Sequence, residues 1–123
     1  MKQILIIDDD SRNIFALKAV LKAKKFNSIC ASSAAEGISY LKSQDNIGII
    51  LMDMMMPDMD GYQAISKIRA DQKLLNIPII AVTAQAMVGD KERCLQAGAN
   101  GYISKPINID QLLVLINQHI KDG

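Results

Sequence analysis

The 123-residue chain has few of the residues from which metal, redox and nucleic-acid sites are usually built. It contains one histidine, His119, and two cysteines, Cys30 and Cys94, at no metal-ligand spacing. A zinc site of histidines and cysteines and a histidine-based catalytic triad are therefore excluded, and we expect two reduced, buried thiols. The net charge of +1 provides no general attraction to nucleic acid or to anionic membranes.

Tryptophan and long apolar runs are absent as well. No stretch approaches the roughly 20 apolar residues of a membrane span, and the N-terminus lacks the layout of a signal peptide. Apolar residues make up 50% of the chain but aromatics only 4%, so we expect an aliphatic, methionine-containing core. The length suits one cytoplasmic domain, residues 1–123, without membrane or direct nucleic-acid contacts. The start at Met1 favours a stand-alone protein.

What the chain does have is a regular alternation of apolar runs and helical patterns. Short apolar runs, typical of strands that are covered on both faces, occur at residues 4–7, 28–31, 47–52, 79–82 and 102–103. Helical spacing or capping residues predict helices at 11–24, after Ser33, at 62–70, at 90–97, and from Asn108 to include Ile120. Five alternations with these short connections indicate a parallel sheet with helices on both faces. His119 is expected to be exposed near the end of the last helix.

Acids, a threonine and a lysine follow the first, third, fourth and fifth apolar runs. Asp8 and Asp9 follow the first run, Asp53 the third, Thr83 the fourth and Lys105 the fifth. Open α/β sheets build their sites where the carboxyl ends of the strands meet. Carboxylates brought together repel one another unless a cation is present, and oxygen ligands of this kind suit Mg²⁺. Together with a lysine and a hydroxyl, they predict a phosphoryl group on Asp53, since an aspartate can act as the nucleophile in phosphoryl transfer.

Several neighbouring residues are interpreted more simply. Asp10 suits the first turn of the helix that follows it. Met54 and Met56 are expected to pack in the loop after the third strand rather than to bind a ligand. Asp58 and Asp60 are expected to be ordinary loop acids.

Four segments, in order and at this spacing, resemble the receiver domain of two-component response regulators. They are ILIIDDD (4–10), IILMDMMMPDMDGY (49–62), PIIAVTA (78–84) and GANGYISKPI (98–107). The resemblance covers essentially the whole chain. It implies an α/β, flavodoxin-like (βα)5 three-layer sandwich with a parallel five-stranded sheet of order 2-1-3-4-5.

The resemblance also implies an acceptor and a metal site. Asp53 would be the phospho-acceptor. Mg²⁺, for which Mn²⁺ could substitute, would be bound by Asp8, Asp9, Asp53 and the backbone carbonyl of Met55. Met55 and Gln85 stand at positions that vary in the family and tune the lifetime of the phosphoryl group.

Phosphate-binding and switch residues are implied in the same way. Thr83, Ala84 and Lys105 would contact the phosphoryl oxygens, and the bond from Lys105 to Pro106 is expected to be cis. Thr83 and Tyr102 would form the switch pair, with Tyr102 turning inward on phosphorylation. The surface of the fourth helix, fifth strand and fifth helix would then change.

The implied function is that of a phosphorylated switch rather than an enzyme, because the chain catalyses only its own phosphorylation and dephosphorylation. The donor would be a histidine kinase or a histidine phosphotransfer protein, and the output a protein target bound through the switching surface. The chain would be a monomer or a phosphorylation-dependent dimer.

Two other functions fit the sequence less well. A phosphohydrolase of the haloacid dehalogenase type would use Asp8-x-Asp10, but Arg12 stands where it needs Thr or Val, and Cys94 where it needs an acid. A receiver fold that works without phosphorylation usually lacks one of the acids or the lysine, all of which are present here. A nucleotide-binding P-loop is excluded because no G-x-x-x-x-G-K-[ST] occurs.

Overall fold

The computed structural model describes residues 2–57, 59–84 and 89–120. The strands are β1 (Gln3–Ile7), β2 (Ser28–Ala31), β3 (Ile47–Asp53), β4 (Ile79–Thr83) and β5 (Gly101–Ser104). The helices are α1 (Ser11–Ala23), α2 (Ala34–Ser43), α3 (Gly61–Ala70), α4 (Asp90–Ala97) and α5 (Ile109–His119). Gln85 and Asp58, two of the residues considered above, lie outside the described residues.

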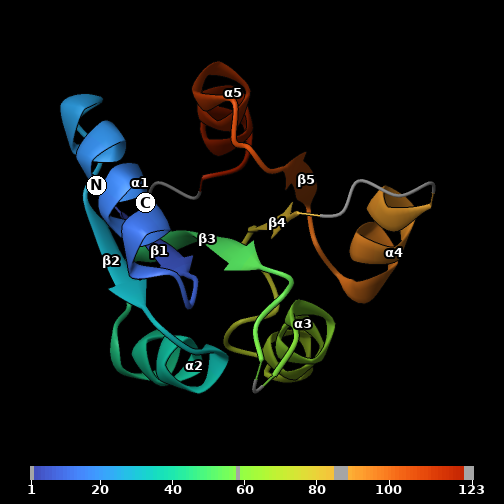
Figure 1. Ribbon diagram of the computed structural model, residues 1–123. Helices are drawn as coiled ribbons and strands as arrows, with labels where there is room; N and C mark the ends of the chain where they lie inside the picture. The colour runs from blue at the N-terminus through green and yellow to red at the C-terminus, as the bar shows by residue number, and fades with distance from the viewer. Residues whose placement is uncertain (1, 58, 85–88, 121–123) are drawn as a thin grey trace.

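All five strands are parallel and lie in the order β2-β1-β3-β4-β5. Figure 1 shows the helices on both sides of this sheet, with α1 and α5 above it and α2 and α3 below it. The predicted fold class, including the strand order, is therefore confirmed. The chain continues from each strand into a helix before it returns to a parallel strand, as this topology requires.

Two separate cores cover the two faces of the sheet. In β1, Leu5 and Ile7 join the core under α2 and α3, whereas Ile4 and Ile6 join the core under α1 and α5. Neighbouring residues of a strand point to opposite faces of the sheet. Because both faces are covered, all four side chains are buried. This explains why the strands appear in the sequence as continuous apolar runs rather than as an alternation of apolar and polar residues.

Side chains cap the helices that lead away from the sheet. Asp10 accepts a hydrogen bond from Arg12 N at the start of α1, which agrees with its interpretation as a helix-terminal acid. Ser33 accepts one from Glu36 N at the start of α2. The Glu36 carboxylate returns to the backbone N–H of Ser32, one residue before the cap, so the capping box is shifted by one residue from its usual form.

Two predictions about the last helix were wrong. The helix α5 ends at His119, and Ile120 is extended and packs against the core as the residue after the helix. His119 itself is half-buried rather than exposed. Its Nε2 lies 3.9 Å from the position that a Cβ on Gly101 would occupy, so the final turn of α5 lies over the start of β5.

Candidate functional site

Three carboxylates meet at the carboxyl end of the sheet. Asp8 follows β1 directly and Asp53 is the last residue of β3, and these two strands are neighbours in the sheet. One carboxylate oxygen from each of Asp8, Asp9 and Asp53 lies within 4.8 Å of the other two. Asp8 and Asp53 are buried and Asp9 is exposed. The structure thus brings together the acids that the strand ends predicted to be close.

Lys105 provides the positive charge of this site. Its Nζ lies 3.6 Å from Asp8 Oδ2 and 3.8 Å from Asp53 Oδ1. The residue follows β5, and its backbone N–H donates to the carbonyl of Thr83 at 2.7 Å. The peptide bond from Lys105 to Pro106, expected to be cis, is cis.

Backbone hydrogen bonds fix the two buried carboxylates. Asp8 Oδ1 accepts from Asp10 N at 2.9 Å, and Asp53 Oδ1 accepts from Met55 N at 3.1 Å. Both are contacts between residues two apart in the chain, made where a strand turns into its loop. Such bonds hold a carboxylate in one orientation without neutralising it.

The loop after β3 is anchored by its methionines. Met54 and Met56 are buried in the core under α2 and α3, as predicted, whereas the side chain of Met55 is 52% exposed. At the end of the loop Gly61 approaches the backbone closely, since a Cβ there would lie 2.7 Å from Met54 Cα. The carboxylate of Asp60 accepts from Gln63 N and caps α3, consistent with a loop acid rather than a ligand.

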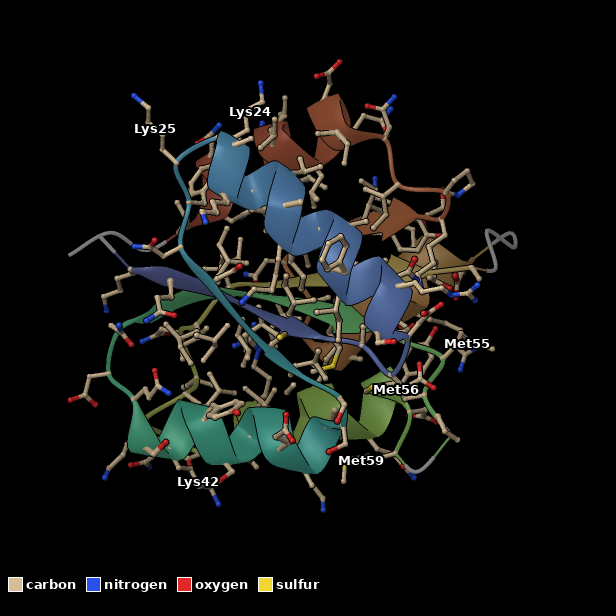
Figure 2. The ribbon with its side chains drawn as sticks, turned by 60° about the vertical axis from the view of Figure 1, so that its left-hand side comes forward. Lys24, Lys25, Lys42, Met55, Met56 and Met59 are labelled. Atoms are coloured by element: carbon tan, nitrogen blue, oxygen red, sulfur yellow. The ribbon has the colours of Figure 1, made fainter. Side chains whose placement is uncertain are left out.

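In Figure 2, the basic residues Lys24 and Lys25 that follow α1 lie away from the loop after Asp53. Met55 and Met56 lie at one end of the molecule, and Lys24 and Lys25 lie at the other. Among the described residues, Lys105 is the cation that forms ion pairs with Asp8 and Asp53.

The charges of the site do not balance. Burial raises the pKa of Asp53, and the neighbouring charges of Asp8 and Asp9 raise it further, against the opposing effects of the Met55 N–H and the Lys105 ammonium. Three acids and one lysine leave an excess of negative charge in a partly buried place. Hard oxygen donors with unbalanced charge suit a divalent cation such as Mg²⁺.

Hydroxyl and amide donors border the same place. Thr83 is the last residue of β4, buried, and pairs in the sheet with Ser104, which precedes Lys105. Ala84 follows it and is exposed. These residues lie on the strand next to β3, so the side of the site away from Asp8 is lined by β4.

Sequence reasoning did not identify Asp90, which contacts one of the predicted switch residues. Tyr102 is half-buried on β5 and donates from its hydroxyl to Asp90 Oδ2 at 3.3 Å. Asp90 is the first residue of α4, a position where an acid is common because it interacts favourably with the helix dipole. Only the tertiary structure distinguishes this acid from an ordinary helix-terminal one.

Comparison with known proteins agrees with this geometry. Residues 4–117 match the family model of the response regulator receiver domain. The polar-differentiation response regulator DivK of Brucella ovis is 33% identical over 122 residues, which cover 99% of this chain and 98% of that protein.

Two solved structures are informative as well. The receiver domain of the sensor histidine kinase PA1611 from Pseudomonas aeruginosa, with a magnesium ion coordinated in its active-site cleft, is 33% identical, with a TM-score of 0.82 and 96% of each chain covered. The receiver domain of Saccharomyces cerevisiae Ssk1, solved with the histidine phosphotransfer protein Ypd1, is 26% identical, with a TM-score of 0.87 over 96% of this chain and 88% of that one. In the part of the chain that the structure describes, no helix is long and apolar enough to cross a membrane. The fold, the acidic cluster and these similarities together show that the chain belongs to the family of response regulator receiver domains.

Proposed function

We propose that this receiver domain accepts a phosphoryl group on Asp53 from a phosphohistidine. The observation that supports this most directly is the position of the Lys105 ammonium between two buried carboxylates, 3.8 Å from Asp53 Oδ1 and 3.6 Å from Asp8 Oδ2. An ammonium placed there can contact an oxygen of a group attached to Asp53. Charge in the transition state of phosphoryl transfer develops on such oxygens, so fixed positive groups lower the barrier.

The transfer exchanges one bond for another. A carboxylate oxygen of Asp53 attacks phosphorus, a P–O bond forms and the P–N bond of the phosphohistidine breaks. The imidazole nitrogen keeps the electron pair and is reprotonated from solvent. Lys105, the hydroxyl of Thr83 and the backbone N–H of Ala84 stabilise the phosphoryl oxygens. Hydrolysis later returns the carboxylate, so the chain acts on itself and is not an enzyme in the usual sense.

The donor set fits Mg²⁺, and the related PA1611 domain binds it in its cleft. Asp8, Asp9, Asp53 and the carbonyl of Met55 would hold the ion, and Mn²⁺ could substitute because it too accepts oxygen ligands. When bound, the ion supplies positive charge that offsets the phosphoryl oxygens. The chain's own contribution is to hold the acids in place through the N–H groups of Asp10 and Met55.

Phosphorylation would shift the chain between two surface states. Thr83 moves toward the phosphoryl group, Tyr102 turns inward, and the surface of α4, β5 and α5 then binds a downstream protein. The size of the population shift is set by the difference in the free energy of these contacts between the two states. The donor would be a histidine kinase or a histidine phosphotransfer protein, as in the Ssk1–Ypd1 complex. The setting would be the cytoplasm, and the chain a monomer or a phosphorylation-dependent dimer.

A transfer experiment tests this proposal. A histidine phosphotransfer protein carrying labelled phosphate is mixed with wild-type chain, with Asp53→Asn and with Lys105→Ala, in the presence of Mg²⁺. We expect label to move to the wild type, to be absent from Asp53→Asn, and to move at least tenfold more slowly to Lys105→Ala, which loses a charge contact. The result expected of an interaction module that works without phosphorylation is different: no transfer from any donor, with binding to the partner retained.

A further inference from the structure

Asp90 holds two tyrosines from different elements with a single carboxylate. The hydroxyl of Tyr62, in α3, donates to Asp90 Oδ1 at 2.9 Å. The hydroxyl of Tyr102, in β5, donates to Asp90 Oδ2 at 3.3 Å. All three side chains are half-buried, and hydrogen bonds to a charged acceptor are stronger than neutral ones. One residue at the start of α4 therefore joins α3, α4 and β5.

Tyr62 is held by α4 on two further sides. The guanidinium of Arg93 lies 4.5 Å from the centroid of the Tyr62 ring, a cation–π distance. The Sγ of Cys94 lies 3.8 Å from the Tyr62 hydroxyl. Burial and the Asp90 carboxylate raise the pKa of both Tyr62 and Tyr102, so both hydroxyls remain protonated donors at neutral pH.

We propose that Asp90 is a positioning residue that sets the orientation of Tyr102, and that Tyr62 fixes the Asp90 carboxylate for this purpose. The inference rests on the proposed function, in which Tyr102 carries the response to the surface. Tyr102 can leave its present orientation only by giving up the hydrogen bond to Asp90. That bond therefore favours the orientation of the unphosphorylated chain.

The contact with Tyr62 extends this control toward the phosphorylation site. Tyr62 is the second residue of α3, and α3 begins where the loop after Asp53 ends. A movement of that loop reaches Asp90 through Tyr62, by a route separate from Thr83. Because both tyrosines share one carboxylate, loss of the Tyr62 hydroxyl should change the environment of Tyr102 as well. Residues within one hydrogen-bonded network are expected to show such coupling.

NMR of chain labelled with ¹³C in tyrosine tests the inference directly. The three tyrosines include Tyr40 in α2, which serves as an internal reference. In the unphosphorylated chain, Asp90→Ala should move the ring resonances of Tyr62 and Tyr102 and leave Tyr40 in place. The equilibrium between the two Tyr102 orientations should change on the order of tenfold, as expected for one hydrogen bond to a charged group. Asp110→Asn, which alters an exposed acid in the first turn of α5, is the matched control and should move none of them.

A second readout separates a positioning role from a purely structural one. With Mg²⁺ and acetyl phosphate as donor, and with occupancy measured by mass, phosphorylation should move the Tyr102 resonances of the wild type. In Asp90→Ala they should be displaced toward the phosphorylated position, and in Tyr62→Phe they should be displaced in the same direction by a smaller amount. Unchanged Tyr102 resonances in Asp90→Ala and Tyr62→Phe would overturn the inference. If Asp90→Ala does not fold, Asp90→Asn, which keeps one acceptor oxygen, and Tyr62→Phe decide.

Failure of the proposed function would look different. A wild-type chain that gains no phosphoryl mass contradicts the acceptor role of Asp53. The spectra of the unphosphorylated variants still decide whether Asp90 sets the orientation of Tyr102.

Discussion

At the scale of single residues, Asp53 combines burial with uncompensated charge. Its carboxylate is 4% exposed, and it shares the site with two other acids and one lysine. Burial of a charged group is unfavourable unless it is fully paired. The proposed phospho-acceptor is thus expected to reduce the stability of the metal-free chain.

Asp53→Asn should therefore stabilise the metal-free chain at neutral pH. Because the pKa of Asp53 is raised on folding, its contribution to stability is fully present below the unfolded-state pKa of about 3.9 and is lost as pH rises through the folded-state pKa. Asparagine does not ionise, so Asp53→Asn does not lose this stability as the pH rises. In EDTA at pH 7 we expect the melting temperature to rise by about 3–6 °C, which corresponds to about 1 kcal/mol, and the gain to shrink as pH falls toward 4.

Thermal unfolding followed by circular dichroism measures this difference. The control is Asp45→Asn, since Asp45 is an exposed loop acid, and its melting temperature should change little. A melting temperature for Asp53→Asn below that of the wild type, or a difference that does not depend on pH, would show that Lys105 compensates the Asp53 charge fully.

At the scale of elements, Arg69 of α3 stabilises the end of the sheet opposite the acidic cluster, where β4 and β5 begin. Its guanidinium donates to the carbonyls of Ile77 at 2.7 Å and Gly98 at 2.8 Å, and to Asn100 Oδ1 at 2.8 Å. Asn100 Oδ1 in turn accepts from Ile79 N at the start of β4. One side chain therefore connects α3 with the segments that lead into β4 and β5.

Arg69→Met should destabilise the fold by about 2–4 kcal/mol, because several backbone carbonyls lose a charged donor. Urea unfolding at equilibrium measures the change. Arg69→Lys keeps the charge but loses the planar guanidinium with its several donors. Its free energy of unfolding should lie between those of the wild type and Arg69→Met. A loss below about 0.5 kcal/mol, the range of ordinary surface substitutions, would mean that water replaces these contacts at no cost.

Local patterns predicted most of the elements, and tertiary contacts explain the rest. Continuous apolar runs such as residues 4–7 identified the buried strands because the sheet is covered on both faces. The exposure of His119 was predicted wrongly because its burial depends on β5, which lies beneath the last turn of α5. The convergence of the acids at the ends of β1 and β3 was predictable, since the carboxyl ends of parallel strands meet at one end of the sheet. The partners of Arg69 and Asp90 were not, because they lie far away along the chain.

At the scale of the whole molecule, the site depends on three different strands of the sheet. Asp8 comes from the end of β1, Asp53 from β3 and Lys105 from the end of β5, and none of these segments could place the site alone. A ligand that binds only the assembled site must stabilise the whole fold, by an amount set by its concentration relative to its dissociation constant.

Mg²⁺ should accordingly raise the melting temperature of the wild type. At a concentration 100 times the dissociation constant, the gain is about 2.7 kcal/mol. Asp9→Asn removes the exposed carboxylate of the proposed metal site without disturbing the two buried ones, so it should fold normally and lose most of this gain. Equal Mg²⁺ stabilisation of the wild type and Asp9→Asn would place the ion elsewhere on the molecule.

The acceptor role of Asp53 is tested most directly by the intact mass of the chain after incubation with acetyl phosphate. Wild type, Asp53→Asn and Asp45→Asn are compared with Mg²⁺ and with EDTA. We predict one phosphoryl group on the wild type and on Asp45→Asn, dependent on Mg²⁺, stable in acid and labile in base, and none on Asp53→Asn. No phosphoryl group on a wild type that is folded and binds Mg²⁺, or an equal amount on Asp53→Asn, would contradict the acceptor role of Asp53.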